Sequence, residues 1–224
     1  MKQPFFSIVT ISFNQSRYIK QCIESVLQQD FQDFEYIIQD PGSTDSSREI
    51  IKSFKCNNLK IFFEEDKSPA DGLNKGFSKA KGEFYFFLNS DDLITKDCLS
   101  CLYRIIKENP SYDVYSCGTE IIDAKGKSLR KAYSDNFDLN GAIYGHSILI
   151  QQSTTFRSSL FKSVGGFNIY NKAHWDGELF IEFALKSAKF FKTNVIISKY
   201  RLTEESITGS GIFEELNIHF AKRM

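Results

Sequence analysis

Two adjacent carboxylates, Asp91 and Asp92, lie just beyond the apolar run Phe84–Leu88. A run of this length and composition predicts a buried strand. Like charges this close repel each other and raise each other's pKa, so the pair is most stable beside a divalent cation. The structural alternative is that Ser90 and the two acids turn the chain and cap a helix near Thr95.

The first half of the chain alternates apolar segments with helical patterns over 19–27, 45–54 and 70–81. The expected strands are Phe5–Phe13, Phe34–Gln39, Leu59–Glu64 and Phe84–Leu88. This alternation predicts an α/β fold with a doubly wound, mostly parallel sheet, whose ligands bind beyond the carboxyl ends of the strands. The polar residues at those ends are Ser12, Asn14, Asp40, Glu65, Asp66, Asp91 and Asp92. So many carboxylates at one edge predict a site for a cation or a polyhydroxyl ligand.

The order of elements is less regular beyond a helical pattern at Thr95–Lys107. Further strands are expected at Tyr112–Ile122, Leu129–Tyr133 and Thr193–Ser198, and helices at Phe161–Val164, Asp176–Ser187 and Ile212–Ala221. Neither a repeat nor a linker interrupts residues 1–224. We therefore expect a single domain whose second half holds the more variable ligand.

Composition narrows the possible partners and surroundings of the protein. Basic and acidic residues both number 28, so the net charge is zero and nucleic acid is not an expected partner. No apolar run approaches the roughly 18 residues that span a bilayer, and no signal-peptide pattern precedes the first strand, so a cytoplasmic protein is expected. Cys98 and Cys101 fall in a helical pattern without a second ligand pair, which favours reduced thiols over zinc.

Seven segments combine turn residues with polar side chains. They are Ser7-Ile-Val-Thr-Ile-Ser-Phe-Asn14, Asp40-Pro-Gly-Ser-Thr-Asp45, Asp71-Gly-Leu-Asn-Lys-Gly76, Leu88-Asn-Ser-Asp-Asp92, Gln152-Ser-Thr-Thr-Phe-Arg157, Gly165-Gly-Phe167 and Trp175-Asp176. In order and spacing they resemble the motifs of the family 2 glycosyltransferases of GT-A fold, over nearly the whole chain. The resemblance implies transfer of a sugar from a nucleoside-diphosphate sugar, the uridine nucleotide being expected.

The resemblance also implies where the donor binds. Thr10, Ser12 and Asp40 match positions that contact the base and ribose, and Asp71 matches one that approaches the base. Asp40 also stands before Pro-Gly, where it could merely set a turn. These residues belong to an expected nucleotide-binding half, 1–110.

The metal-binding D-x-D motif of the family corresponds here to Asn89-Ser90-Asp91. Its first acid is an amide, which can still hydrogen-bond a ribose hydroxyl. The resemblance therefore implies that Asn89 and Ser90 contact the donor, and that Asp91, supported by Asp92, binds Mn2+ or Mg2+.

The second half, 111–224, is expected to bind the acceptor and to supply the catalytic base. Arg201 and Ser206 resemble positions that contact the diphosphate, although Glu204 stands where many members have histidine or glycine. Asp176 matches the base position, and a single base acting by direct displacement inverts the anomeric centre.

Other interpretations of these residues remain open. Asp176 could be an acid favoured by the helix dipole, Glu178 is a competing base, and His174 could line the acceptor site. A catalytically degenerate nucleotide-sugar-binding protein would explain Asn89 and Glu204. A sugar-nucleotide pyrophosphorylase is disfavoured because 14–18 lacks the glycines of a phosphate loop.

The expected acceptor is a hydroxyl of a glycan or of a lipid-linked molecule, in the synthesis of a bacterial surface polysaccharide. A lipid-linked acceptor requires peripheral contact with the inner face of a membrane. The apolar and basic segment His219–Met224 is too short to decide this question.

Overall fold

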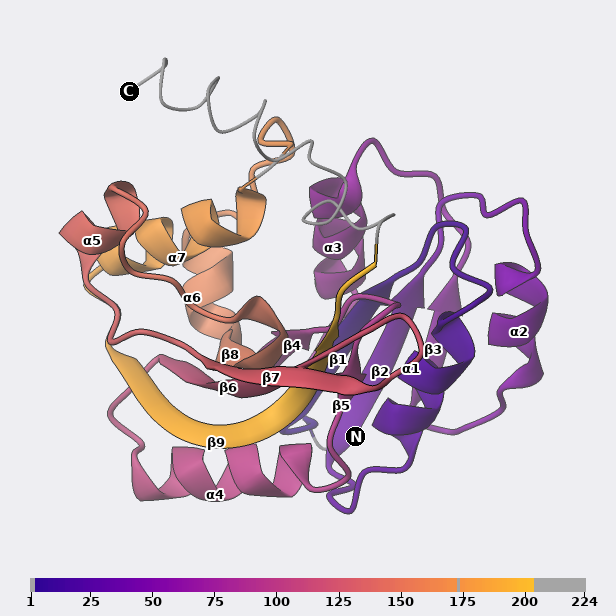
Figure 1. Ribbon diagram of the computed structural model, residues 1–224. Helices are drawn as coiled ribbons and strands as arrows, with labels where there is room; N and C mark the ends of the chain where they lie inside the picture. The colour runs from indigo at the N-terminus through magenta and orange to yellow at the C-terminus, as the bar shows by residue number, and fades with distance from the viewer. Residues whose placement is uncertain (1–2, 173, 204–224) are drawn as a thin grey trace.

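The computed structural model describes residues 3–172 and 174–203, and nine strands within them form one sheet (Figure 1). The strands are β1 (Phe6–Ile11), β2 (Phe34–Gln39), β3 (Leu59–Phe62), β4 (Phe84–Phe87), β5 (Leu93–Ile94), β6 (Val114–Ile122), β7 (Ser128–Tyr133), β8 (Thr154–Arg157) and β9 (Phe190–Arg201). The helices are α1 (Ile19–Leu27), α2 (Ser47–Ser53), α3 (Pro69–Ser78), α4 (Cys98–Glu108), α5 (Leu139–Ile143), α6 (Ser158–Ser163) and α7 (Trp175–Leu185), with a 3-10 turn at Gln151–Ser153.

The strand order is β3-β2-β1-β4-β8-β6-β9-β5, and β7 pairs with β6. The first four of these strands are parallel, whereas β8 is antiparallel to both β4 and β6. β6 and β9 are again parallel. The α/β class and the doubly wound sheet are confirmed, with a continuous parallel part in the first half and mixed pairing in the second.

The central strand β4 is buried on both faces, which explains its unbroken apolar sequence. Phe84 and Phe86 pack into the core layer that contains residues of α1 and α4. Tyr85 and Phe87 point to the opposite layer, with residues of α3, α6 and α7. Burial of each such side chain contributes roughly 1.5–3 kcal/mol to folding, so this strand fixes the position of the acidic residues that follow it.

Two elements and one strand length differ from the expectation. β5 has two residues and α5 has five, too few for a hydrophobic period to reveal them. β9 extends from Phe190 to Arg201, beyond the expected 193–198, because it pairs along most of β6 and then with β5. The expected helix Ile212–Ala221 lies outside the described residues.

The loops that follow β1, β2, β3 and β4 all leave the sheet at one edge, because these strands are parallel. This edge faces upward in Figure 1, and α3 and α7 flank it. A membrane-spanning helix is absent from the described part of the chain. The edge therefore holds the candidate residues on a framework of two core layers.

Candidate active site

Hydrogen bonds hold the loop after β1 against the loop after β2. The side chains of Ser43, Asp45 and Ser47 accept the backbone N–H groups of residues 14–16 at 2.8–2.9 Å. Asn14, whose φ is 52°, returns a bond through Oδ1 to the Thr44 N–H at 2.8 Å. These bonds fix the turn that contains Gly-Ser-Thr-Asp45 against the loop after β1 at this edge of the sheet.

Asp40, the first residue after β2, is completely buried beneath that turn. Its Oδ1 accepts the N–H groups of Gly42 and Ser43 and, at 2.8 Å, Nε of Arg48, while Oδ2 accepts Ser43 Oγ at 2.6 Å. Burial acts to raise the pKa of Asp40, but these donors outweigh it and hold the pKa below its ordinary value. The turn-setting role is therefore present in the structure, and the nucleotide contact of Asp40 stays a prediction.

Thr10 lies beneath the edge in a small buried polar network. Its Oγ1 accepts Tyr36 Oη at 3.0 Å, and Cys22 Sγ is 3.9 Å from each of these oxygens. Burial raises the pKa of the Cys22 thiol to about 12, so it is inert at neutral pH. Thr10 supports the site from below, and its predicted contact with the nucleotide has no exposed surface in this structure.

Four buried side-chain polar atoms have no hydrogen-bond partner within the described residues. They are Ser12 Oγ, Tyr18 Oη, Gln39 Oε1 and Asp92 Oδ2. Such atoms are uncommon in folded proteins and call for an explanation. All four belong to segments at or beside the carboxyl edge of the sheet, where a polar ligand would satisfy them. Gln39 was not a candidate from the sequence, because its position shows only a polar residue ending an apolar strand.

Residues 89–92, just beyond the end of the central strand β4, form a tight loop. Asp92 N–H donates to Asn89 O at 3.1 Å, and Asn89 Nδ2 donates to Gln151 Oε1 at 3.4 Å. Gln151 in turn donates from Nε2 to Phe87 O at 2.9 Å, so the 3-10 turn before β8 clamps the end of β4. Ser90 is buried in the same loop.

The two adjacent acids have different surroundings. Asp91 is partly exposed, whereas Asp92 is fully buried and its Oδ1 accepts the Arg201 N–H at 2.9 Å. Burial raises the pKa of both carboxyls, and the Asp91 charge raises that of Asp92 further. The Gln152 side chain acts in the opposite direction on Asp92, although Oδ2 has no partner at hydrogen-bonding geometry.

A divalent cation fits this loop only if the donor completes its coordination. No group of three or more His, Cys, Asp or Glu side chains that could hold a metal occurs among the described residues. Mg2+ and Mn2+ are commonly held by one or two carboxylates together with substrate phosphates. The partly exposed Asp91 and Asp92, with its unpartnered Oδ2, match that pattern.

Asp66, in the loop between β3 and α3, and Asp71, in the first turn of α3, have pKa values shifted in opposite directions. Asp71 accepts the Lys67 N–H at 2.9 Å and pairs with Lys75 at 3.1 Å, and these donors lower its pKa despite burial. Asp71, which was predicted to approach the nucleotide base, thus binds the backbone of the loop that precedes α3. Asp66, in contrast, has its pKa raised to about 6 by burial and by the charge of Asp71. Its Oδ2 lies 2.6 Å from the position that a Cβ on Gly72 would occupy. A larger residue at position 72 would therefore displace the Asp66 carboxyl.

We expect Asp66→Asn to stabilise the protein above pH 6. Because the folded pKa of Asp66 lies above the unfolded value, its contribution to stability is complete below about pH 4 and is lost as pH rises through 6. The rise of this pKa to about 6, discounted for solvent screening, corresponds to about 1 kcal/mol, or roughly 2–4 °C in the unfolding midpoint at pH 8. Thermal unfolding of both proteins at pH 4 and pH 8 measures this, and an equal gain at both pH values would refute the electrostatic cause.

Asp176 is brought to the same edge by aromatic packing. The ring centroid of its neighbour Trp175 lies 5.5 Å from that of Phe87 and 5.2 Å from that of Phe167. Phe87 stands two residues before Asn89, so the first turn of α7 lies beside the acidic loop. The Asp176 carboxyl is partly buried, burial raises its pKa, and Oδ1 accepts the Gly177 N–H at 2.9 Å.

Glu178 has a different task from Asp176. Its two oxygens accept the side-chain amides of Asn168 and Asn171, which fixes the loop before α7. Two residues on a helix are about 200° apart around its axis, so Glu178 faces away from Asp176. Glu178 lines a hollow of about 340 Å³ together with Glu182. His174 donates its N–H to Asn171 Oδ1 at 3.0 Å and lowers the pKa of Asp176.

Of the two residues predicted to contact the diphosphate, Arg201 lies within the described residues. The Arg201 guanidinium is buried and binds acceptors of the protein itself. Ser206 and Glu204 lie outside the described residues.

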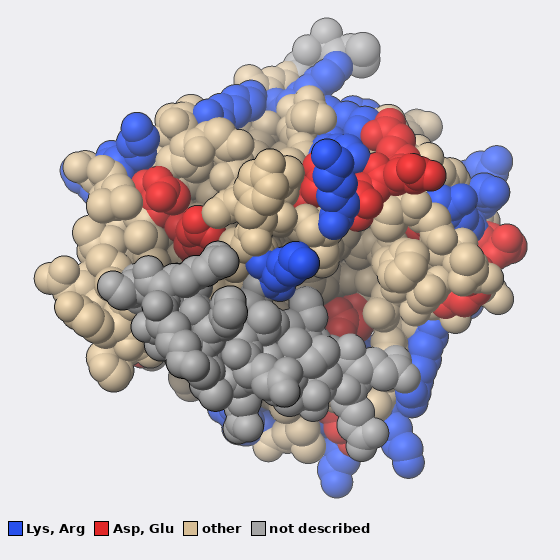
Figure 2. Space-filling view, turned by 90° about the horizontal axis from the view of Figure 1, so that it is seen from above, with Lys and Arg blue, Asp and Glu red and all other residues tan. Residues whose placement is uncertain are grey.

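Figure 2 views the molecule from the side of the carboxyl ends, and acidic residues gather around and within a hollow on that face.

Comparison with known proteins agrees with this geometry. The model of the family described as glycosyl transferase family 2 matches residues 7–174. The chain belongs to glycosyl transferase family 2. An uncharacterized glycosyltransferase of Rickettsia typhi is 27% identical over 233 residues, covering 99% of this chain and 73% of that protein. A PGL/p-HBAD biosynthesis glycosyltransferase of Mycobacterium tuberculosis is 31% identical over 183 residues, covering 79% of this chain and 69% of the relative.

Solved structures show the GT-A fold of this family 2 domain. TarS of S. aureus, crystallised with UDP-GlcNAc, superimposes with a TM-score of 0.77 at 22% identity, over 97% of this chain and 65% of that one. The mannosyltransferase PcManGT of Pyrobaculum calidifontis, with GDP-Man and Mn2+, gives 0.74 at 18% identity, over 100% and 65%. The chain therefore spans slightly less than two thirds of these enzymes.

One family 2 motif has a clear structural role. In the segment Asp71–Gly76, Asn74 donates from Nδ2 to Phe167 O at 2.8 Å and accepts the Phe167 N–H at 2.9 Å. This reciprocal pair fastens α3 to the Gly165-Gly-Phe167 loop. The motif thereby connects the nucleotide side of the domain to the segment that leads into α7.

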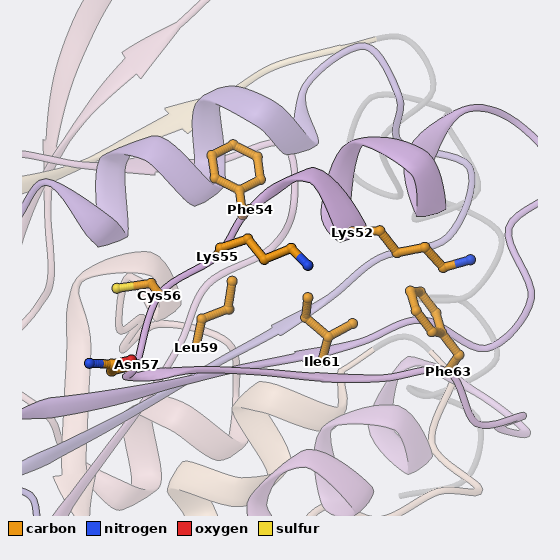
Figure 3. Close-up of a pocket in the computed structure, with 8 residues that line it drawn as sticks. All are labelled: Lys52, Phe54, Lys55, Cys56, Asn57, Leu59, Ile61 and Phe63. Carbon is orange, nitrogen blue, oxygen red and sulfur yellow. The ribbon is translucent and has the colours of Figure 1, made fainter.

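A second hollow, of about 510 Å³, lies away from the candidate residues, between α2 and β3 at the outer edge of the sheet. Figure 3 shows Leu59 and Ile61 on its floor, with Lys52 near Phe63 at one end. None of its lining residues is an acid, and none comes from the loops after β1, β2 or β4. It is therefore separate from the chemistry of the carboxyl edge.

Proposed function

We propose that the protein is an inverting hexosyltransferase that moves a sugar from a nucleoside-diphosphate sugar to a hydroxyl of its acceptor. The observation that carries the proposal is the packing of Trp175 on Phe87. This contact supports the proposal because Asp176 follows Trp175 directly and the loop of Asn89, Asp91 and Asp92 follows shortly after Phe87, so that the proposed base and the proposed cation site come from different elements. A direct displacement needs this separation, because base and leaving group lie on opposite sides of the anomeric carbon.

Donor binding falls to the carboxyl ends of the parallel strands. Ser12, Asn89 and Ser90 are proposed to contact the nucleotide, with Thr10, Asp40 and Asp71 holding their loops in place. Two further residues are proposed donor contacts. They are Gln39, whose Oε1 has no hydrogen-bond partner, and Asp66, whose pKa burial raises to about 6.

Asp91, with Asp92 behind it, would hold Mn2+ or Mg2+ against the diphosphate. A bound cation neutralises charge on the departing diphosphate as a Lewis acid. Asp176 accepts the proton of the attacking hydroxyl. The Gly177 N–H occupies one acceptor site of Oδ1, and an ionised carboxylate has about four such sites, so the group keeps capacity to accept the proton of the alcohol.

The finer assignment rests on the neighbours. TarS was crystallised with UDP-GlcNAc, which supports a uridine donor, whereas PcManGT was crystallised with GDP-Man and Mn2+. A relative named as a PGL/p-HBAD biosynthesis glycosyltransferase supports a role in glycan biosynthesis. The proposed acceptor is a glycan or a lipid-linked molecule, used at the cytoplasmic face of a membrane in surface-polysaccharide synthesis. The competing proposal is a degenerate domain that binds nucleotide sugars without turnover, favoured by Asn89 in place of the first metal ligand.

Thermal unfolding with UDP-, GDP- and dTDP-sugars, each with and without Mn2+, tests the donor assignment. We expect a UDP-sugar with Mn2+ at a hundred times its dissociation constant to add about 2.7 kcal/mol, roughly 5–10 °C at this chain length. Stabilisation by a GDP-sugar instead would overturn the uridine assignment alone. Stabilisation without any product, across a panel of hydroxyl acceptors, would favour the non-catalytic proposal.

A further inference from the structure

Arg201, the last residue of β9, is the largest of the fully buried side chains and is 1% exposed. A buried cation is costly unless its donors are satisfied. Nε donates to Asp91 O at 2.8 Å and Nη2 to Gln21 Oε1 at 2.9 Å. Nη1 is shared between the carbonyls of Asp123 and Ala124, at 3.3 and 3.4 Å.

Two further contacts complete the surroundings of Arg201. The guanidinium carbon lies 4.7 Å from the centroid of the Tyr18 ring, which begins α1. The backbone N–H of Arg201 donates to Asp92 Oδ1 at 2.9 Å. One residue therefore holds the main chain of Asp91 and the side chain of Asp92, and joins them to α1 and to the β6–β7 turn. Figure 1 shows β9 curving under the sheet and rising beside these elements.

This arrangement argues against a direct contact between Arg201 and the diphosphate. All three guanidinium nitrogens already donate to protein acceptors, and the planar group is stacked on a ring and closed off from solvent. A phosphate could reach it only if these bonds broke. A lysine could not reproduce them, because a single ammonium group lacks the fork that reaches acceptors on separate elements.

We propose that Arg201 is a positioning residue that aims the Asp91 carboxylate at the divalent cation, acting through the Asp91 carbonyl and the Asp92 side chain. The inference rests on the proposed function, since it assumes metal-assisted donor binding. The two acids then have different roles: Asp92 is buried and anchored by the Arg201 N–H, whereas the partly exposed Asp91 is the residue that contacts the cation. The cation-dependent part of donor binding is then the quantity that depends on Arg201.

Calorimetric titration of the full chain with UDP, with and without Mn2+, tests this. In Arg201→Lys we expect the gain in UDP affinity from Mn2+ to fall by about 10- to 100-fold, the usual effect of losing a group that orients a metal ligand. UDP affinity without Mn2+ should stay within about twofold, because the Arg201 side chain bonds to none of the proposed nucleotide contacts Ser12, Asn89 and Ser90. A direct diphosphate contact predicts the reverse, namely weaker UDP binding without metal and unchanged binding of uridine.

Gln21→Ala provides a second variant, in case Arg201→Lys does not fold. The exposed Gln21 contributes one acceptor to the guanidinium, so we expect a smaller loss of the same Mn2+-dependent gain. Gln28→Ala, at an exposed position ending the same helix, should match the wild type. A full Mn2+ gain in both Arg201→Lys and Gln21→Ala would overturn the role of Arg201 alone. A wild-type protein without any Mn2+ gain would overturn the proposed metal-assisted function, and the positioning role with it.

Discussion

Replacing Asp176 with asparagine is expected to lower the turnover number for sugar transfer by about 100- to 10,000-fold, the usual contribution of a general base. The amide keeps the shape of the side chain and can still accept the Gly177 N–H, but it cannot take a proton. UDP affinity should remain within a few-fold, because the nucleotide side of the domain is untouched. Steady-state transfer kinetics and UDP titration on the same preparation measure the two effects.

The pH dependence of sugar transfer provides a second test of Asp176 as the general base. Burial raises the pKa of Asp176, so the fraction in the basic form, and with it the wild-type turnover number, increases as pH rises through that pKa. The residual activity of Asp176→Asn should lack this ascending limb.

Glu178→Gln is the matched control for Asp176→Asn. It removes the same charge from the same first turn of α7, so both variants lose a similar helix-dipole contribution of about 0.3–1 kcal/mol. Glu178 holds Asn168 and Asn171, and its loss should raise KM for the acceptor more than it lowers turnover. If Glu178→Gln abolishes transfer and Asp176→Asn does not, the base has been assigned to the wrong carboxyl.

The layout of the first half was predictable because local sequence and tertiary burial agree there. The central strand is apolar at every position from Phe84 to Leu88, since helices cover both faces of the sheet. The second half was less predictable. β9 carries exposed residues such as Asn194 and Val195 within its twelve positions, so its length depends on pairing with β6, which no local period records.

The candidate site divides in the same way. Residues that end strands could be located, because parallel strands bring their carboxyl ends together. The sequence could not tell which of those side chains are already used by the protein. Asp40 is saturated by a turn and by Arg48, whereas Asp66 stands four residues beyond β3 with a raised pKa. The difference arises from donors on other segments, and a single sequence does not show which segments meet.

Asp91→Asn is expected to abolish the Mn2+ dependence of the reaction and to reduce transfer by at least about 100-fold, since Lewis-acid stabilisation of the leaving group is worth several kcal/mol. The loop should keep its shape in this variant. Arg201 Nε binds the Asp91 carbonyl and not its carboxyl, and the Arg201 N–H binds Asp92, so the substitution leaves these bonds in place. The loss would therefore come from the missing charge.

Asp97→Asn removes an equal charge from an exposed position just before α4, where the carboxyl accepts a hydrogen bond from Thr95 Oγ1 at 2.8 Å. It should leave both transfer and its Mn2+ dependence unchanged. Full Mn2+-dependent transfer by Asp91→Asn would mean that Asp92, despite complete burial, is the ligand that matters. Because Asp92 is completely buried, that result would also require the loop to rearrange when the donor binds, so that the unpartnered Oδ2 could reach the cation.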